Sequence, residues 1–185
     1  MEQNALRRQM MEEAAKAGLA LGLVSTAYLF LTQLLSVLQI SSFIIIAFNS
    51  ILWLGKFGGC IWLMMTFMKK VVESVPESDN STTFRFGILI AIFSSLVYAA
   101  ASFANIAFIA SDTVTEQMNL IMQQTAPMLD SNSTAKMEEI IEKLPQLTFF
   151  SNLIYCFLYG TILSFILSRN IPSRNPFANN TSDEW

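Results

Sequence analysis

The chain has 185 residues, of which 53% are hydrophobic and only 14% are charged. Soluble domains are about one quarter charged, so this composition indicates a membrane protein. It excludes a nucleic-acid-binding protein, a disulfide scaffold and a disordered chain. The chain contains no histidine, which removes the catalytic and metal-binding chemistry that depends on an imidazole. We therefore expect no enzyme, no metal site and no cofactor.

Four long apolar segments predict four transmembrane helices, at residues 17–38, 42–68, 86–110 and 147–167. About 20 helical residues cross a bilayer core of about 30 Å, so each segment is long enough. The alternating pattern of a membrane β-barrel is absent. The sequence thus predicts an all-α fold in which residues 1–185 form one integral membrane domain, a bundle of four transmembrane helices. The first segment is longer than the core of a signal peptide, so we expect it to be retained.

Lysine and arginine are distributed unevenly around the four segments. The N-terminal segment, the loop between the second and third segments, and the tail at residues 168–185 share one side. That side carries Arg7, Arg8, Lys16, Lys69, Lys70, Arg85, Arg169 and Arg174, whereas the other side carries Lys136 and Lys143. Loops rich in lysine and arginine stay in the cytoplasm. We therefore expect both termini, and the tail at 168–185, to be cytoplasmic.

The segment at residues 111–146 predicts an extracytoplasmic helical hairpin between the third and fourth transmembrane helices. Apolar residues recur at helical spacing in both of its halves, and Pro127 lies between them. The segment is acidic, and this has two interpretations. It is either a solvated acidic surface, or a docking surface for a cationic partner or divalent ions that uses Glu138, Glu139 and Glu142.

Lys56 is the one charged residue inside the four apolar segments, about 18 Å along a helix from Met68. Charged residues at such a depth usually face other helices and have a partner there. The neutral candidates for a shared polar site are Asn49, Asn105 and Asn152, with Thr26, Gln33 and Tyr98 as further acceptors. Lys56 then either contacts an anion, a lipid head group or a substrate, or is a structural lysine satisfied by polar neighbours. Alternatively, the boundary of the second segment lies elsewhere, so that Lys56 is outside the membrane.

Small residues recur at every fourth position within the apolar segments. The rows contain Gly18 and Gly22 in the first segment, Gly55 and Gly59 in the second, and Gly160 and Ser164 in the fourth. Such rows allow two helix backbones to approach closely in a membrane. They predict helix packing, either within the chain or between two copies of it.

Short motifs along nearly the whole chain resemble an uncharacterised bacterial family. Phe84-Arg85-Phe86-Gly87 opens the third segment, Ser95-Leu96-Val97-Tyr98 lies within it, and the tail contains Arg174-Asn175-Pro176-Phe177. The segment with Glu116, Gln117 and Met118 fits the same family. This family is a domain of unknown function, a small four-helix membrane protein of Bacteroidetes-type bacteria. The resemblance implies a bacterial inner-membrane location, but no activity, no catalytic residue and no role for Lys56.

Three classes of function follow from these observations. The acidic loop and the small-residue rows favour a non-enzymatic structural or accessory protein of the envelope. The alternative is a small transporter or channel-like oligomer in which Lys56 and Asn49 line a polar path. A membrane enzyme is the third class, and Lys56 lacks the acid–base partner that it would need. The expected partners are the lipid bilayer and either another membrane protein or further copies of the chain, and not nucleic acid.

Overall fold

The computed structural model describes residues 2–37, 42–74, 79–125 and 131–172. These segments are almost entirely helical and contain no strand, which confirms the predicted all-helical fold. The elements in chain order are α1 (Glu2–Val37), α2 (Ser42–Ser74), α3 (Asn80–Ala104), the short π-helix η1 (Asn105–Ile109), α4 (Ser111–Thr125), α5 (Ser131–Glu142) and α6 (Leu144–Asn170).

Four helical stretches coincide with the predicted transmembrane segments and are long and apolar enough to cross a membrane. They are Arg7–Leu35, Phe43–Ser74, Asn80–Ile109 and Leu144–Asn170. The helices extend past the predicted segments because their polar flanks also form helical contacts. In α1, for example, Arg8 Nε lies 3.2 Å from Glu12 Oε1, one turn further along. With 36 residues, α1 is about 54 Å long, well beyond the thickness of a bilayer core.

The last helix continues past residue 168, the predicted start of the C-terminal tail. The helix α6 continues to Asn170, and Ile171 is only 3% exposed and belongs to the hydrophobic core. Hydropathy falls at Ser168, but the helical hydrogen bonds continue, so the apolar run ends before the helix does. The rest of the predicted tail, residues 173–185, lies outside the described residues.

The helix α3 begins at a side-chain cap. Asp79 Oδ1 accepts a hydrogen bond of 2.7 Å from the backbone N–H of Thr82, which satisfies one of the free donors of the first turn. Burial opposes ionisation of Asp79, but the hydrogen bonds from Thr82 outweigh it and lower the pKa of this carboxyl below its usual value. The cap therefore stays charged at neutral pH and fixes the start of α3.

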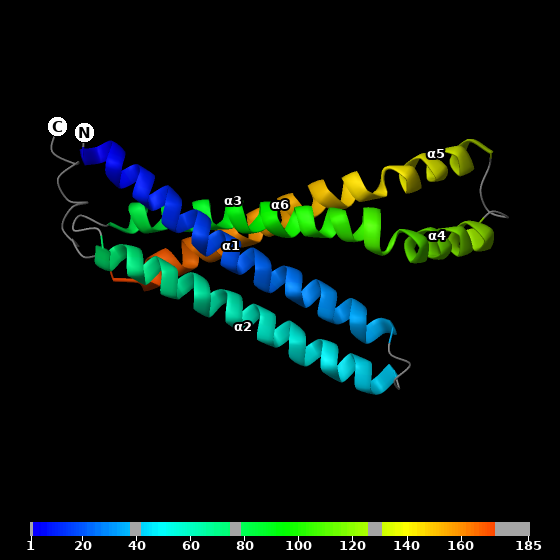
Figure 1. Ribbon diagram of the computed structural model, residues 1–185, viewed down its shortest axis with the longest axis horizontal. Coiled ribbons are helices and arrows are strands. Elements are labelled where there is room, and N and C mark those ends of the chain that lie inside the picture. The colour runs from blue at the N-terminus through cyan, green and yellow to red at the C-terminus, as the bar shows by residue number, and fades with distance from the viewer. Residues whose placement is uncertain (1, 38–41, 75–78, 126–130, 173–185) are drawn as a thin grey trace.

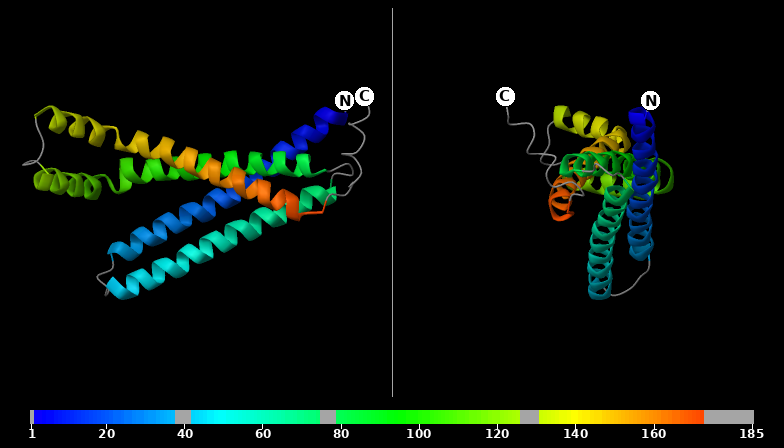
Figure 2. Two further views of the ribbon diagram at one scale, coloured as in Figure 1. Left: turned by 180° about the vertical axis from the view of Figure 1, so that it is seen from behind. Right: turned by 90° about the vertical axis from the view of Figure 1, so that its left-hand side faces the viewer.

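The four long helices form two pairs that meet at one end and diverge at the other. The pair α1 and α2 and the pair α3 and α6 each lie side by side, and α1 crosses α3 (Figure 1). The start of α1 and the end of α6 lie at the end where the pairs meet, which we call the closed end. The pairs separate towards the opposite, splayed end, and α4 and α5 extend beyond it from α3 and α6 (Figure 2).

The hydrophobic core lies at the closed end. It comprises Ala14, Ala17 and Leu21 of α1, Met64, Met68, Val71 and Val72 of α2, Phe86 and Ile90 of α3, and Leu167 and Ile171. The splayed half of α2 differs sharply, since Phe43 is 80% exposed and Ile51 is 66% exposed. Apolar side chains without protein neighbours are favourable only in an apolar environment such as lipid. The apolar side chains at the closed end are therefore surrounded by protein, whereas those at the splayed end need apolar surroundings outside the chain.

The crossing of α1 and α3 depends on two glycines. A Cβ atom added to Gly22 would lie 2.6 Å from Val97 Cβ and 3.2 Å from the backbone oxygen of Ser94. A Cβ atom added to Gly18 would overlap Phe93 Cβ. The backbone of α1 therefore contacts α3 directly, and the close approach increases the dispersion contact between the helices.

Small residues also line the contact between α3 and α6. A Cβ atom added to Gly160 would lie 2.6 Å from Ala91 Cβ, and one added to Gly87 would lie 2.6 Å from Ser164 Oγ. Ser164 is fully buried, and its hydroxyl donates a 2.7 Å hydrogen bond to the Gly160 carbonyl within the same helix. This local bond satisfies the hydroxyl where no water reaches it.

Gly55 and Gly59 do not pack against another described helix of the chain, so of the two predicted alternatives only contact between two copies stays a prediction for them. Among the described residues, no atom of another element lies within 4 Å of a Cβ atom added at either position. Spacing by four residues places small side chains along one stripe of a helix, but it does not determine which stripe meets a neighbour. In α2 the packed stripe carries Met64 and Met68 instead.

Adding one methyl group at a packed glycine and at an open glycine tests these contacts. Gly22→Ala should destabilise the protein, because overpacking costs about 1–3 kcal/mol and exceeds the gain of about 1 kcal/mol in helix propensity. Gly59→Ala is the matched control and should be neutral or stabilising. Thermal unfolding in detergent, followed by circular dichroism, measures both, and equal effects of the two variants would contradict the helix crossing described above.

Candidate functional site

A cavity of about 90 Å³ lies between the four long helices, next to the core on its splayed side. All four helices contribute to its walls, and its polar lining residues are Ser25, Lys56, Cys60, Ser94, Tyr98, Tyr155, Cys156 and Tyr159. One water needs about 10–15 Å³ of such space, so the cavity has room for several waters or a small polar head group. The remaining lining residues are mainly apolar, including Met64, Ile90 and Leu163.

Lys56 lies between two tyrosine rings. Its Nζ atom is 4.8 Å from the ring centroid of Tyr28 in α1 and 5.1 Å from that of Tyr98 in α3. Both distances fall within the range of cation–π interactions, each worth about 2 kcal/mol when desolvated. A lysine at the centre of a transmembrane helix costs about 2.5–3.5 kcal/mol on insertion scales. The two rings therefore offset part of the cost that apolar surroundings would impose on this charge.

The two rings leave the hydrogen-bonding capacity of Lys56 unused. An ammonium group has three N–H donors, and a ring face accepts them only weakly. In the described part of the chain, Lys56 Nζ has neither a carboxylate within ion-pair distance nor a hydrogen-bond acceptor. Its donors are thus available to whatever occupies the cavity.

Three of the four tyrosines of the chain line this cavity, and the fourth contacts Lys56. The Tyr28 ring contacts Lys56, and Tyr98, Tyr155 and Tyr159 line the cavity wall. Tyrosines of membrane proteins are usually enriched near the ends of the transmembrane segments. Here each one falls near the middle of its segment. This displacement is a signal in the sequence that points to the polar site, and the motif-based prediction used only Tyr98.

Of the four residues predicted to form an intramembrane polar site, only Lys56 lies in the cavity wall. Asn49 lies two turns further towards the splayed end, where it lines a separate surface depression with Tyr28 and Ser50. Asn49 precedes Lys56 by seven residues, so the two lie about 10 Å apart along α2. Tyr28 therefore lies between them, because its ring contacts Lys56 and also lines the depression that contains Asn49.

Asn105 and Asn152 do not line the cavity. Asn105 begins η1, is 8% exposed, and its side-chain oxygen has no hydrogen-bond partner among the described residues. Asn152 is half-buried on α6, one turn before Cys156. Asn152 precedes Cys156 by four residues and Asn105 follows Tyr98 by seven, so each lies on the helix face of a cavity residue but one to two turns nearer the splayed end. The predicted shared polar site therefore does not bring these two residues to the cavity, because they lie at a different depth from Lys56.

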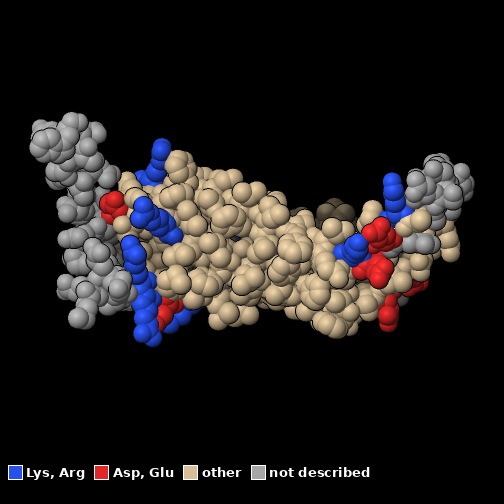
Figure 3. Space-filling view, turned by 90° about the horizontal axis from the view of Figure 1, so that it is seen from above, with Lys and Arg blue, Asp and Glu red and all other residues tan. Residues whose placement is uncertain are grey.

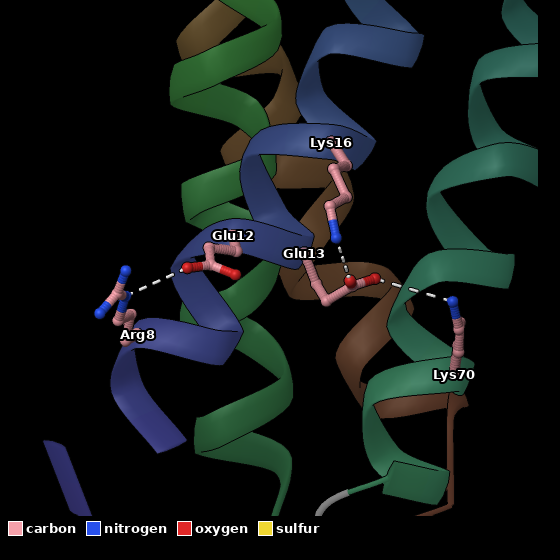
Figure 4. Close-up of polar contacts among 5 residues, drawn as sticks. All are labelled: Arg8, Glu12, Glu13, Lys16 and Lys70. Carbon is pink, nitrogen blue, oxygen red and sulfur yellow. Dashed lines mark hydrogen bonds and ion pairs between the residues drawn. The ribbon is translucent and has the colours of Figure 1, made fainter. Parts of the chain in front are cut away.

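Charged side chains gather at the two ends of the molecule. The closed end carries Arg7, Arg8, Lys16, Lys69, Lys70, Arg85 and Arg169, and the visible surface between the two ends is uncharged (Figure 3). Glu13 links α1 to α2 there, with its oxygens 2.8 Å from Lys16 Nζ and 3.7 Å from Lys70 Nζ (Figure 4). Such exposed pairs contribute about 0–1 kcal/mol, so they orient the helix ends more than they stabilise them.

The described acidic side chains of α4 and α5 form no recognisable ion site. Glu139 Oε1 accepts a 2.6 Å hydrogen bond from Lys143 Nζ, and this contact lowers the pKa of Glu139. In the described segments, no three His, Cys, Asp or Glu residues come together in a way that could hold a metal. The side chain of Glu138 lies outside the described residues. Of the three glutamates predicted to form a docking surface for a cationic partner or divalent ions, the structure therefore describes only the side chains of Glu139 and Glu142.

A family model described as a protein of unknown function, DUF4199, matches residues 15–169. The chain belongs to this family. The match runs from α1 through α6, so the predicted resemblance to a family of unknown function is confirmed, whereas the origin in Bacteroidetes stays a prediction. No curated protein matches the chain, and no solved structure matches it. Membership of the DUF4199 family therefore supplies no activity, and the cavity has to be interpreted from its own chemistry.

The cavity of this DUF4199 protein contains both cysteines of the chain, Cys60 from α2 and Cys156 from α6. A short reagent with two thiol-reactive groups should therefore join them within one molecule in native membranes. Intact mass after purification measures the link, and Cys60→Ser and Cys156→Ser are the matched controls that should abolish it. If the reagent only adds separately at each cysteine, or only joins two chains, the convergence of α2 and α6 on one cavity is contradicted.

Proposed function

We propose that the protein is a multi-pass protein of a bacterial inner membrane, with both termini in the cytoplasm and α4 and α5 outside it as a helical hairpin. We propose further that it has a non-enzymatic structural or accessory role in the envelope. The proposed topology rests on one observation, the distribution of lysine and arginine between the two ends of the four apolar helices. Seven described lysines and arginines lie at the closed end, and Lys136 and Lys143 lie beyond the splayed end. Positive flanks remain on the cytoplasmic side of a membrane.

The chemistry of the described residues supports a non-enzymatic role. The chain has no histidine, and Lys56 has no described carboxylate near it that could exchange a proton with it. General acid–base catalysis needs a side chain positioned to give or take a proton at the reacting atom, with a pKa near the working pH, and histidine and the carboxylates are its usual agents. The cavity supplies hydrogen-bond donors and apolar walls, which are suited to binding.

A transporter or channel-like oligomer remains the second candidate, because the cavity contains a lysine at mid-depth. The core argues against a path through one chain, however. Between the cavity and the closed end, Met68 and Ile90 have no exposed surface and Met64 is 1% exposed. These packed side chains close the cavity on its cytoplasmic side. The geometry therefore favours a binding site that is closed towards the closed end of the bundle and does not continue through the chain.

Reporter fusions in a bacterium test the topology. Alkaline phosphatase, which is active only outside the cytoplasm, should be active when it is fused after Asn132 and inactive when it is fused after Asp79. A fluorescent protein fused after Arg169 should fold and fluoresce, because the closed end lies in the cytoplasm.

Membrane fractionation supplies the control for these fusions. The untagged protein should stay in the membrane pellet after extraction with alkaline carbonate, because four apolar helices anchor it. Release into the soluble fraction would contradict the membrane location. The reverse pattern of phosphatase activity would overturn the proposed orientation.

A further inference from the structure

We propose that the cavity around Lys56 binds a single-chain amphiphile with one carboxylate, a long-chain fatty acid, which reaches it from the lipid between α2 and α6. The inference rests on the proposed membrane location, since the apolar tail of the ligand requires lipid around the helices. It goes beyond that location by assigning a binding site and the chemical class of its ligand.

The charge of the site selects an anion. Lys56 Nζ lies in the cavity wall between the Tyr28 and Tyr98 rings, and no described acidic side chain pairs with it. Cation–π contacts stabilise the positive charge but leave its three N–H donors without acceptors. A carboxylate supplies strong acceptors and the opposite charge, and such charge-assisted bonds are stronger than neutral ones. Water alone would supply acceptors without neutralising the charge.

The surroundings of the site select an anion with an apolar tail. The core closes the cavity towards the basic end, so an ion from the cytoplasm has no route to Lys56. On the α6 side, Tyr155 lines the cavity and is 67% exposed, so the cavity wall continues onto the outer surface of the helix. The surface next to it is apolar, since Ile154 is 58% exposed and Leu158 is 54% exposed. A chain of methylene groups fits that surface, whereas a hydrated ion does not.

The seam between α2 and α6 is the point of access. These two helices make few contacts with each other, in contrast to α3 and α6. Beside the cavity the seam is bridged by the Phe57 and Tyr159 rings, edge to face with centroids 5.4 Å apart. Two aromatic side chains can rotate aside at little cost compared with the separation of packed helix backbones. The same rings then cover the bound head group.

The size and charge of the site favour a carboxylate over a phosphate. A cavity of about 90 Å³ with one cation has room for a small, singly charged group. A phospholipid would bring a larger head group and two acyl chains to a depth of about 18 Å along α2. Desolvation of each additional charge is unfavourable there, and no second described lysine or arginine lines the cavity to neutralise it.

Equilibrium binding of radiolabelled oleate to the full-length protein in neutral detergent micelles tests the proposal, with empty micelles as background. Wild type should bind one oleate saturably. Lys56→Met should weaken binding by about 10- to 100-fold, the loss expected for a charge-assisted hydrogen bond. Lys56→Arg should retain most of the affinity. Lys136→Met removes an exposed lysine of α5 and should leave binding unchanged.

Two further ligands separate the charge from the tail. Oleyl alcohol has the same chain without the carboxylate and should bind at least about tenfold more weakly than oleate, whereas acetate should not displace oleate at equal concentration. The proposal is overturned if Lys56→Met binds oleate as tightly as wild type. It is also overturned if oleyl alcohol binds equally well, if acetate displaces oleate, or if a phospholipid with a phosphate head group displaces oleate at equal concentration.

The failure of this proposal is distinguishable from the failure of the proposed membrane location. Carbonate extraction of the same variants reports membrane integration, and circular dichroism reports their helix content and thermal unfolding. If the protein stays in the membrane and keeps its helices but binds no oleate, the fatty-acid site is wrong and the membrane location stands. If Lys56→Met unfolds, Tyr98→Leu and Lys56→Gln replace it, because both alter the cation site while leaving the apolar core in place.

Discussion

A positive charge held half-way along four apolar helices is the constraint around which the structure is organised. Lys56 cannot reach either end of the bundle, so the chain stabilises it where it lies, between the rings of Tyr28 and Tyr98. The other two tyrosines and both cysteines line the same cavity. Polar groups that would be scattered in an ordinary apolar bundle therefore form a layer at one depth, with contributions from all four helices.

The packing of the helices determines how this layer is reached. Gly22 of α1 and Gly160 of α6 bring both helices onto α3, and the side chains of the core fill the closed end. The described residues of α2 and α6 make few contacts with each other, and the two pairs diverge beyond the core (Figure 1). The cavity thus has a packed floor, apolar walls and a seam that faces the surroundings. This form is what the proposed fatty-acid site requires.

Hydropathy alone predicted the four long helices, because membrane-spanning helices need uninterrupted apolar runs. It also singled out Lys56 as the exceptional residue. It does not predict the partners of Lys56, since an apolar run does not show which residues of the other helices lie at the level of the lysine. Asn105 and Asn152 share helix faces with the cavity residues Tyr98 and Cys156 but lie one to two turns nearer the splayed end. For Gly55 and Gly59, the spacing predicts a stripe of small residues but not its neighbour, and that stripe meets no other described helix.

Solid-state NMR in lipid bilayers, with ¹⁵N-labelled lysine and ¹³C-labelled tyrosine, reports what surrounds the Lys56 ammonium. One lysine Nζ signal, absent from the spectrum of Lys56→Met, should show dipolar contacts to tyrosine ring carbons and to lipid-chain protons. These contacts would place the ammonium between the two rings and within the membrane. A Lys56 Nζ signal that contacts water alone, with no tyrosine ring near it, would contradict the account.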